Sequence, residues 1–190
     1  MNKSAITFIL LIASQSLLAG PLEDGFDAFR SGNYQQAIKL WMPLAKSDNA
    51  DAMYNMGLLY QQGKGVNKDV KMAMQWYKRA AYFGSADAAY NLGVIYVSRD
   101  GIYPSRKDAI YWWKQAADIG HPESEYNLAV MYLNGMGTRV DVPAGIRLLE
   151  SAARKGQPES IKALMEIYSE GKYGIKVSNK KASYWKRLQN

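Results

Sequence analysis

Few side chains in this sequence could carry a reaction. His121 is the single histidine, and it stands in the segment Gly120-His121-Pro122, where capping of a helix is the expected role. One histidine cannot form a metal-binding pair, and the absence of cysteine excludes thiol catalysis and a cysteine-ligated metal. The loop Gly63-Lys64-Gly65 is too short to cradle a phosphate and is explained by the end of a helix. The sequence therefore predicts no catalytic residue, no metal ion and no cofactor.

One pair of carboxylates has a spacing that acid–base chemistry uses. Glu166 and Glu170 lie one helical turn apart, so both would point to the same side of a helix. In a cleft, such a pair could act on cell-wall material. Near the end of the chain, two acids on one helix also suit a plain solvated face. We favour the solvated face and keep the cell-wall chemistry as the alternative.

An internal repeat must position these residues. The segment Tyr54–Tyr60 recurs with few changes at Tyr90–Tyr96 and Tyr126–Tyr132, and in worn form at Lys162–Tyr168. Each copy begins 36 residues after the previous one, at positions 54, 90, 126 and 162. A constant period of this length is typical of helical hairpins that stack on one another.

Each repeat has the pattern of two helices. In the first helix, Ala52, Met56 and Tyr60 share one face, and the second carries an alanine and aromatic motif at Ala73–Ala81 that recurs at Ala109–Ala117. Glycine follows the helices where a left-handed residue would end them, at Gly63 and Gly135 after first helices and at Gly84, Gly120 and Gly156 after second helices.

Small and bulky residues alternate in these helices. We expect Gly57, Gly93 and Ala129 to let neighbouring helices approach closely, and Trp76 and Trp112 to fill the wider gaps of the core. On that interpretation, truncation of either tryptophan to alanine costs about 3–5 kcal/mol of stability.

The pattern predicts an all-α protein, a right-handed α-solenoid of stacked antiparallel helix pairs (an α/α superhelix). The expected parts are a signal peptide at 1–20, a tetratricopeptide-like hairpin at 21–48, repeats at 49–84, 85–120 and 121–156, and a capping repeat with a basic end at 157–190.

The small residues, aromatic residues and double-glycine loops together resemble the Sel-one-like repeat family, a relative of the tetratricopeptide repeats. The resemblance covers about residues 50–190, whereas Phe26–Ala45 is similar to a plainer tetratricopeptide hairpin. Two features depart from the family pattern. Arg99-Asp100-Gly101 replaces one double-glycine loop, and Gly174 stands one position late, which indicates a one-residue insertion in the last repeat.

The resemblance implies a non-enzymatic interaction module of the bacterial cell envelope that binds a partner protein or peptide on its concave face. Two alternatives also come from the resemblance. Small exported members act as immunity proteins that neutralise a periplasm-delivered toxin, such as a secretion-system effector. Other exported relatives have been linked to peptidoglycan or β-lactam binding, which leaves a cell-wall-acting or β-lactam-binding enzyme as a further alternative.

In similar families the first helices line the concave wall, so their outward residues are the predicted partner-binding surface. Successive residues are about 100° apart around a helix, which turns this surface away from Ala52, Met56 and Tyr60. It consists of a tyrosine row (Tyr54, Tyr90, Tyr126), an asparagine row (Asn55, Asn91, Asn127), an apolar row (Leu58, Val94, Val130) and Gln62. Tyrosine gives a large contact area at low entropic cost, and asparagine can pair with a bound backbone. Packing between repeats is the open alternative for these rows.

The position of the basic residues in the sequence indicates which classes of partner to expect. The formal net charge is +7, and residues 171–190 contain no acid but several basic residues, namely Lys172, Lys176, Lys180, Lys181, Lys186 and Arg187. A balanced body with a basic end is unlike the basic stripe of a nucleic-acid groove, so no nucleic acid is expected. The basic end is either a solvated cap or a contact for an acidic partner or anionic lipid.

The first twenty residues have the pattern of a secretory signal. Lys3 precedes the apolar stretch Ala5–Leu18, and Ala19-Gly20 supplies small residues for cleavage. Pro21 stands where a lipoprotein signal requires cysteine. We therefore expect a periplasmic or secreted product without a lipid anchor.

N-terminal sequencing of the exported protein tests this expectation. The mature chain should begin directly after Ala19 or Gly20, because the small residues end there. An exported protein that still begins at Met1 would contradict it.

Overall fold

The computed structural model describes residues 20–98 and 104–188, and every regular element in these ranges is a helix. The all-α fold class predicted from the sequence is therefore confirmed. The expected signal sequence, apart from Gly20, and the variant loop at 99–101 lie outside the described residues.

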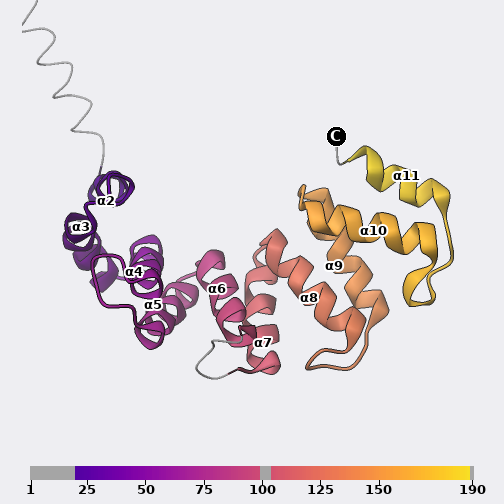
Figure 1. The fold of residues 1–190 in the computed structure, drawn as a ribbon, viewed down its shortest axis with the longest axis horizontal. Helices are drawn as coiled ribbons and strands as arrows, with labels where there is room; N and C mark the ends of the chain where they lie inside the picture. The colour runs from indigo at the N-terminus through magenta and orange to yellow at the C-terminus, as the bar shows by residue number, and fades with distance from the viewer. Residues whose placement is uncertain (1–19, 99–103, 189–190) are drawn as a thin grey trace, which may run out of the picture. The chain divides into compact units, whose positions relative to one another are not determined.

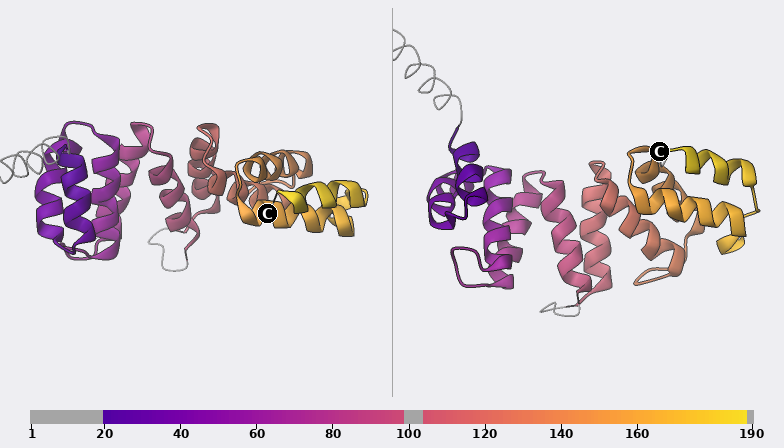
Figure 2. Two further views of the ribbon diagram at one scale, coloured as in Figure 1. Left: turned by 90° about the horizontal axis from the view of Figure 1, so that it is seen from above. Right: turned by 45° about the horizontal axis from the view of Figure 1, so that its top comes forward.

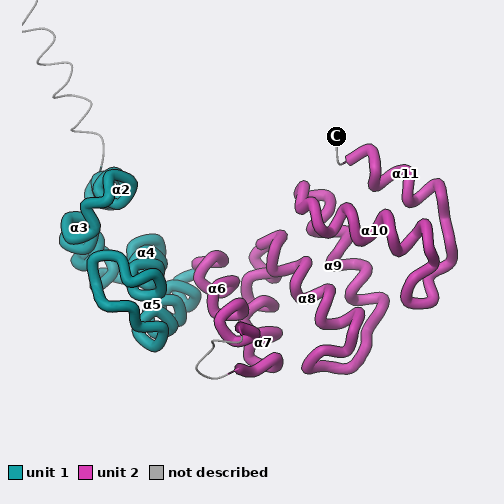
Figure 3. Tube along the Cα trace, in the orientation of Figure 1, with its two compact units in different colours: residues 1–84 teal, residues 85–190 magenta. Residues whose placement is uncertain are grey.

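The chain divides into two compact units, Met1–Gly84 and Ser85–Asn190, which are described separately (Figure 3). The first contains α2 (Pro21–Arg30), α3 (Tyr34–Lys46), α4 (Ala50–Gln62) and α5 (Val70–Tyr82). The second contains α6 (Ala86–Val97), α7 (Arg106–Asp118), α8 (Pro122–Asn134), α9 (Val142–Arg154), α10 (Pro158–Glu170), the short 3-10 helix η1 (Lys172–Gly174) and α11 (Asn179–Arg187).

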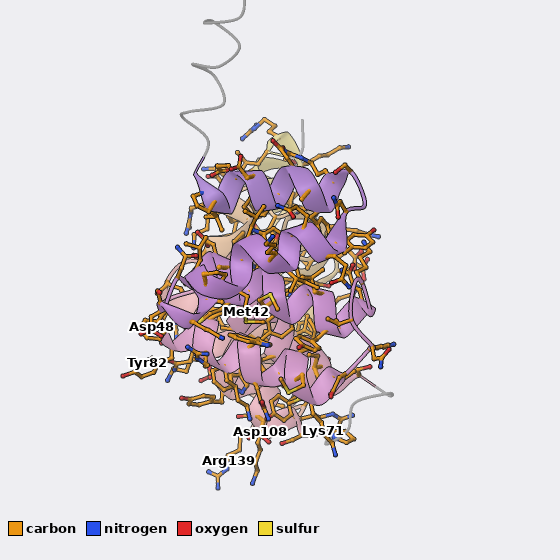
Figure 4. All side chains as sticks on the ribbon, turned by 90° about the vertical axis from the view of Figure 1, so that its left-hand side faces the viewer. Met42, Asp48, Lys71, Tyr82, Asp108 and Arg139 are labelled. Atoms are coloured by element: carbon orange, nitrogen blue, oxygen red, sulfur yellow. The ribbon has the colours of Figure 1, made fainter. Side chains whose placement is uncertain are left out.

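Helices that follow one another in sequence pack as antiparallel hairpins, and each hairpin packs on the next within its unit (Figures 1 and 2). In the first unit α3 contacts α4, and in the second unit α7 contacts α8 and α9 contacts α10. Asp48, in the turn between α3 and α4, and Lys71, on α5, are exposed charged residues of the first unit (Figure 4).

The repeat period fixes where helices begin. The first helices of the four repeats, α4, α6, α8 and α10, are capped by the side chains of Asn49, Ser85, His121 and Gln157, which are 36 residues apart. Each of these side chains accepts a hydrogen bond from a backbone N–H three residues later, which satisfies one free donor of the first turn. The second helices are capped in the same way by Asp69, Ser105, Asp141 and Ser178.

Glycines end the helices, as predicted. Gly63 and Gly135 have φ values of 70° and 65°, in the left-handed region where a side chain would be strained. Gly84, Gly120 and Gly156, after the second helices, also have positive φ.

In each of the first three hairpins, one aromatic ring of the second helix packs against one glycine of the first helix. A Cβ added to Gly57 would lie 2.5 Å from the ring of Tyr77, and one added to Gly93 would overlap the indole of Trp113. Gly25 and Trp41 make the same contact in the first hairpin. The two helices of a hairpin can approach this closely only because the glycine has no side chain.

The indole N–H groups at these contacts are satisfied. Trp113 Nε1 donates to the carbonyl of Tyr90 at 3.2 Å, and Trp41 Nε1 donates to that of Leu22 at 3.1 Å. In both hairpins the accepting residue precedes the glycine by three positions (Leu22 and Gly25, Tyr90 and Gly93), so ring and glycine are fixed together.

The prediction that Trp76 and Trp112 fill the core was wrong. Both are only partly buried, whereas their neighbours Tyr77 and Trp113 are buried. Residues one position apart differ by about 100° around a helix, so only one of two adjacent aromatics can face the glycine. The guanidinium of Arg79 lies 5.1 Å from the Trp76 ring centroid, on the outer side of the packing.

The adjacent tryptophans of α7 allow a matched test. Trp113→Ala should lower the free energy of unfolding by about 3–5 kcal/mol, because it removes a buried ring and leaves a cavity. Trp112→Ala should cost clearly less, because part of its ring already faces water. Urea unfolding of the two variants measures the difference, and an equal or larger loss for Trp112→Ala would contradict the packing described.

Candidate binding site

The predicted partner-binding residues lie on the first helices α4, α6 and α8, and they differ in how far they are buried. Asn55 is only 3% exposed, so it belongs to the core and not to the surface row in which the sequence analysis placed it. Its helical neighbours Ala52 and Leu59 are both fully buried, which places Asn55 on the buried stripe of α4. Its amide nitrogen has no hydrogen-bond partner in the structure.

The other members of the rows are accessible to some extent. Gln62 is exposed, and the remaining predicted residues are partly buried, namely Tyr54, Leu58, Tyr90, Asn91, Val94, Tyr126, Asn127 and Val130. These partly buried side chains therefore contact the core on one side and remain accessible on the other.

The tyrosine row makes different contacts in each repeat. The Tyr54 ring lies 5.8 Å from that of Tyr77, and the Tyr90 ring stacks on His121 at 5.0 Å between centroids. Tyr126 packs against the core cluster of the last two hairpins and also borders a cavity.

That cavity, of about 200 Å³, lies between the first helices α8 and α10. Its lining includes the predicted residues Tyr126 and Val130 and the core residues Leu133, Leu149 and Ile167, together with Ala163. Asn134, Glu166, Lys172 and Tyr173 complete the lining, and none of them was among the predicted site residues. We call this cavity the α8–α10 groove.

Ion pairs form its rim. Lys172 Nζ lies 2.9 Å from Glu166 Oε2 and 3.2 Å from Glu170 Oε2. The hydrogen bond from Lys172, and then its positive charge, lowers the pKa of Glu166, while the hydrogen bonds to Glu166 and Glu170 raise the pKa of Lys172. Glu166 and Lys172 are thus both charged at neutral pH.

These ion pairs bear on the carboxylate pair that the sequence analysis singled out. A general acid needs a raised pKa to hold a proton at neutral pH. The pKa of Glu166 is shifted in the opposite direction, because Lys172 lies between the two carboxylates. The solvated face favoured for Glu166 and Glu170 agrees with this arrangement.

Tyr126 supplies a neutral hydroxyl to the groove. Burial raises its pKa, and the nearby charges of Glu159 and Glu166 raise it further. The phenol therefore keeps its proton at neutral pH and can both donate and accept a hydrogen bond.

Tyr173 stands at the edge of the groove in an unusual backbone conformation. Its φ of 58° is in the left-handed region, which few residues other than glycine adopt. Its side chain is 41% exposed, and its hydroxyl donates to Asn134 Oδ1 at 3.4 Å.

The sequence contained a signal for Tyr173. The repeats with a double-glycine loop have one residue between the two glycines, whereas Gly171 and Gly174 enclose two. The insertion was recognised in the sequence, but its location at an exposed aromatic side chain was not.

His121 has the capping role expected for it. Its Nδ1 accepts from the backbone N–H of Ser124 at 3.2 Å, and its Nε2 lies 3.2 Å from Asp87 Oδ1. Across the ranges that the structure describes, no cluster of three acidic or histidine side chains could hold a metal ion. In the same ranges, no helix has the length and apolar character needed to cross a membrane.

Comparison with known proteins gives a consistent result. The family model described as "Sel1 repeat" matches residues 12–46, 50–83, 86–121 and 122–157, which is more than half of the chain. A solved Sel1 repeat protein from Oxalobacter formigenes is 29% identical, with a TM-score of 0.76. The solved structure of c5321, a protective antigen present in uropathogenic Escherichia coli strains, is 32% identical, with a TM-score of 0.74.

The lengths of these relatives differ from that of this chain. The alignments cover 82% of this chain and 64% of the Oxalobacter protein, and 80% of this chain and 32% of c5321. A curated relative, the ERAD-associated E3 ubiquitin-protein ligase component HRD3 from Candida glabrata, is 37% identical over 49 residues, which is 26% of this chain and 6% of that protein.

The rim of the groove yields a test by titration. In Lys172→Met, the pKa of Glu166 should rise toward its ordinary value, because the hydrogen bond and the positive charge that lower it are both removed. NMR titration of the Glu166 carboxyl carbon measures the shift. Lys162→Met serves as the control, because Lys162 makes the smallest contribution to the shift and should change the pKa less. An unchanged Glu166 pKa in Lys172→Met would show that the ion pair does not form in solution.

Proposed function

The chain belongs to the Sel1 repeat family, whose helical repeats mediate protein interactions, and we propose that it binds a protruding segment of a partner protein in the α8–α10 groove. The proposal assigns binding, and no chemical step, to this surface.

The shape of the groove is the observation that carries the proposal. Sites for small molecules and cofactors commonly have volumes of about 300–1,000 Å³. The α8–α10 groove has about 200 Å³, which suits one anchoring side chain of a larger partner. Anchors of this kind supply a large share of the binding energy at protein interfaces.

The lining indicates which anchor fits. Leu133, Leu149 and Ile167 form an apolar floor, which favours an aliphatic or aromatic side chain. Beside this floor, the neutral Tyr126 hydroxyl offers a hydrogen bond to the backbone next to the anchor, whereas the Asn134 amide already donates to the Val130 carbonyl and accepts from Tyr173. An apolar centre within a polar rim is the usual organisation of a protein interface.

Tyr173 extends this surface beyond the groove. An exposed tyrosine adds contact area with little loss of side-chain entropy, and its hydroxyl can bond to a partner. Its position on a turn held by Gly171 and Gly174 keeps the ring at the edge where a bound segment would leave the groove.

The setting we propose is the bacterial cell envelope, on the strength of the signal-like pattern in residues 1–20. An immunity protein that neutralises a periplasm-delivered toxin would be a special case of the same activity, with the toxin as the partner. A β-lactam-binding or cell-wall-acting enzyme gains no support from the α8–α10 groove, because Lys172 pairs with Glu166, the one carboxylate in its lining, and also with the neighbouring Glu170.

Affinity purification from the envelope fraction of the source organism tests the proposal. The tagged wild-type protein should retain one specific partner, and Val130→Asp should lose it, because a carboxylate in the groove opposes an apolar anchor.

Tyr173→Asn should weaken binding by about 2 kcal/mol if the ring is an anchor of the interface. Asparagine is chosen because it tolerates the left-handed backbone.

Tyr111→Ala is the matched control, because Tyr111 is an exposed tyrosine on α7 outside the groove. Thermal melts of all variants check that the fold is intact. A partner retained equally by wild type, Val130→Asp and Tyr173→Asn would mean that binding occurs elsewhere on the chain.

A further inference from the structure

A second groove lies between the second helices α9 and α11 of the last two repeats. Its volume is about 500 Å³, more than twice that of the α8–α10 groove. The lining residues are Glu150, Arg154, Ser178, Lys180, Lys181, Tyr184, Trp185 and Arg187. We call it the α9–α11 groove.

Positive charge dominates this lining, with four basic residues and one acid. The acid, Glu150, is already engaged, because Arg154 lies 3.3 Å from its Oε2 and the Tyr168 hydroxyl lies 3.2 Å from its Oε1. Within the part of the chain that the structure describes, neither Lys180 nor Arg187 has a carboxylate at ion-pair distance. The groove thus presents cations whose charge the protein itself does not neutralise.

Aromatic rings hold the other two cations in place. Lys181 Nζ lies 4.6 Å from the ring centroid of Tyr168, and the guanidinium of Arg154 lies 5.8 Å from that of Trp185. Such contacts fix the two side chains; Arg154 is also paired with Glu150, whereas Lys181 has no carboxylate at ion-pair distance among the described residues. Tyr184, which is 44% exposed, adds an aromatic wall.

The preceding repeat shows that this charge is not needed for packing. The groove between α7 and α9, of about 300 Å³, is lined by Lys114 and Arg147 but also by Asp118 and Glu125, so its charges balance. The two grooves occupy equivalent positions of the repeat, since both lie between consecutive second helices.

Individual positions account for the difference. Arg154 of the α9–α11 groove is 36 residues after Asp118, so that an acid has become a base. Lys181 is 37 residues after Ala144, a shift that includes the insertion before Gly174. These two replacements add positive charge, whereas Glu150, 36 residues after Lys114, and Tyr184, 37 residues after Arg147, remove it. The surplus therefore comes from Lys180 and Arg187 and from the lack of a counterpart to Glu125 in this lining.

From these observations we propose that the α9–α11 groove binds an acidic segment of a partner protein. The guanidinium group of Arg187 can engage a carboxylate through two parallel hydrogen bonds, and the lysines add charge that steers the approach of an acidic chain. Cations from two helices line a concavity, which suits a chain lying between the helices better than a flat lipid surface.

This inference rests on the proposed function only in treating the protein as a binding module. It concerns different helices and different chemistry from the α8–α10 groove. Val130→Asp should therefore leave binding at the α9–α11 groove unchanged, and failure of one proposal can be distinguished from failure of the other.

The test is fluorescence anisotropy with a fluorescein-labelled dodecapeptide of glutamate, serine and glycine. The full-length protein should bind it, salt should weaken the binding, and a twin peptide with glutamine in place of glutamate should not bind. Lys180→Glu with Arg187→Gln should weaken binding about tenfold or more. These changes suit the α11 helix, because an acid is favourable in its first turn and the neutral glutamine avoids a negative charge in its last turn.

Lys114→Glu with Arg147→Gln is the matched control, because it changes the charge by the same amount in the balanced groove. It should leave the affinity for the acidic peptide within about twofold of wild type. Equal losses in both double variants would reveal diffuse charge attraction and overturn the proposal. Absence of peptide binding would also overturn the proposal. If the protein floats with phosphatidylglycerol vesicles but does not bind the peptide, the groove would be assigned to lipid instead.

Discussion

The structure depends on one contact, a large side chain packed against a small residue across a helical hairpin. In the first three hairpins the pairs are Gly25 with Trp41, Gly57 with Tyr77, and Gly93 with Trp113. The glycine determines how closely the two helices approach, and the ring determines which faces meet. The rings at 41, 77 and 113 follow the 36-residue period, and the α8–α9 hairpin reverses the roles, with Gly145 of α9 against Leu133 of α8.

The regular core leaves the surface positions free to differ between repeats. Grooves between consecutive first helices and between consecutive second helices have floors made by packing, so their existence does not depend on the residues at their rims. The α8–α10 groove acquires an apolar anchor site with Tyr173 at its edge, and the α9–α11 groove acquires positive charge. One interaction module can thereby offer two chemically distinct surfaces within its second unit.

Much of the fold could be predicted from the sequence, because local rules determine it. The left-handed residues that end the helices and the capping role of His121 follow from backbone geometry and hydrogen bonding near each residue. Burial within the core was harder to predict. Trp112 and Trp113 are adjacent residues of the same type, so residue type alone does not predict which of them is buried. The orientation of the helix about its axis determines this, since adjacent residues differ by about 100°.

The candidate site was predicted only in part for the same reason. Tyr126 and Val130 are partly buried on a first helix and line the α8–α10 groove, and their role in binding stays a prediction. Asn55 occupies the same repeat position as Asn91 and Asn127 but is buried in its own hairpin, which a repeat-averaged pattern cannot distinguish. Tyr173 reaches the groove from the double-glycine turn of the last repeat, which contains one residue more than the other double-glycine turns.

Methyl-resolved NMR of the protein with its purified partner tests the central claim most directly, which is that a side chain of the partner enters the α8–α10 groove. The account predicts that the largest shifts occur at the methyl groups of Val130, Leu133 and Ile167, which line that groove. The largest shifts at the methyl groups of Val66 and Val70 in the first unit, with those of the groove unchanged, would contradict it.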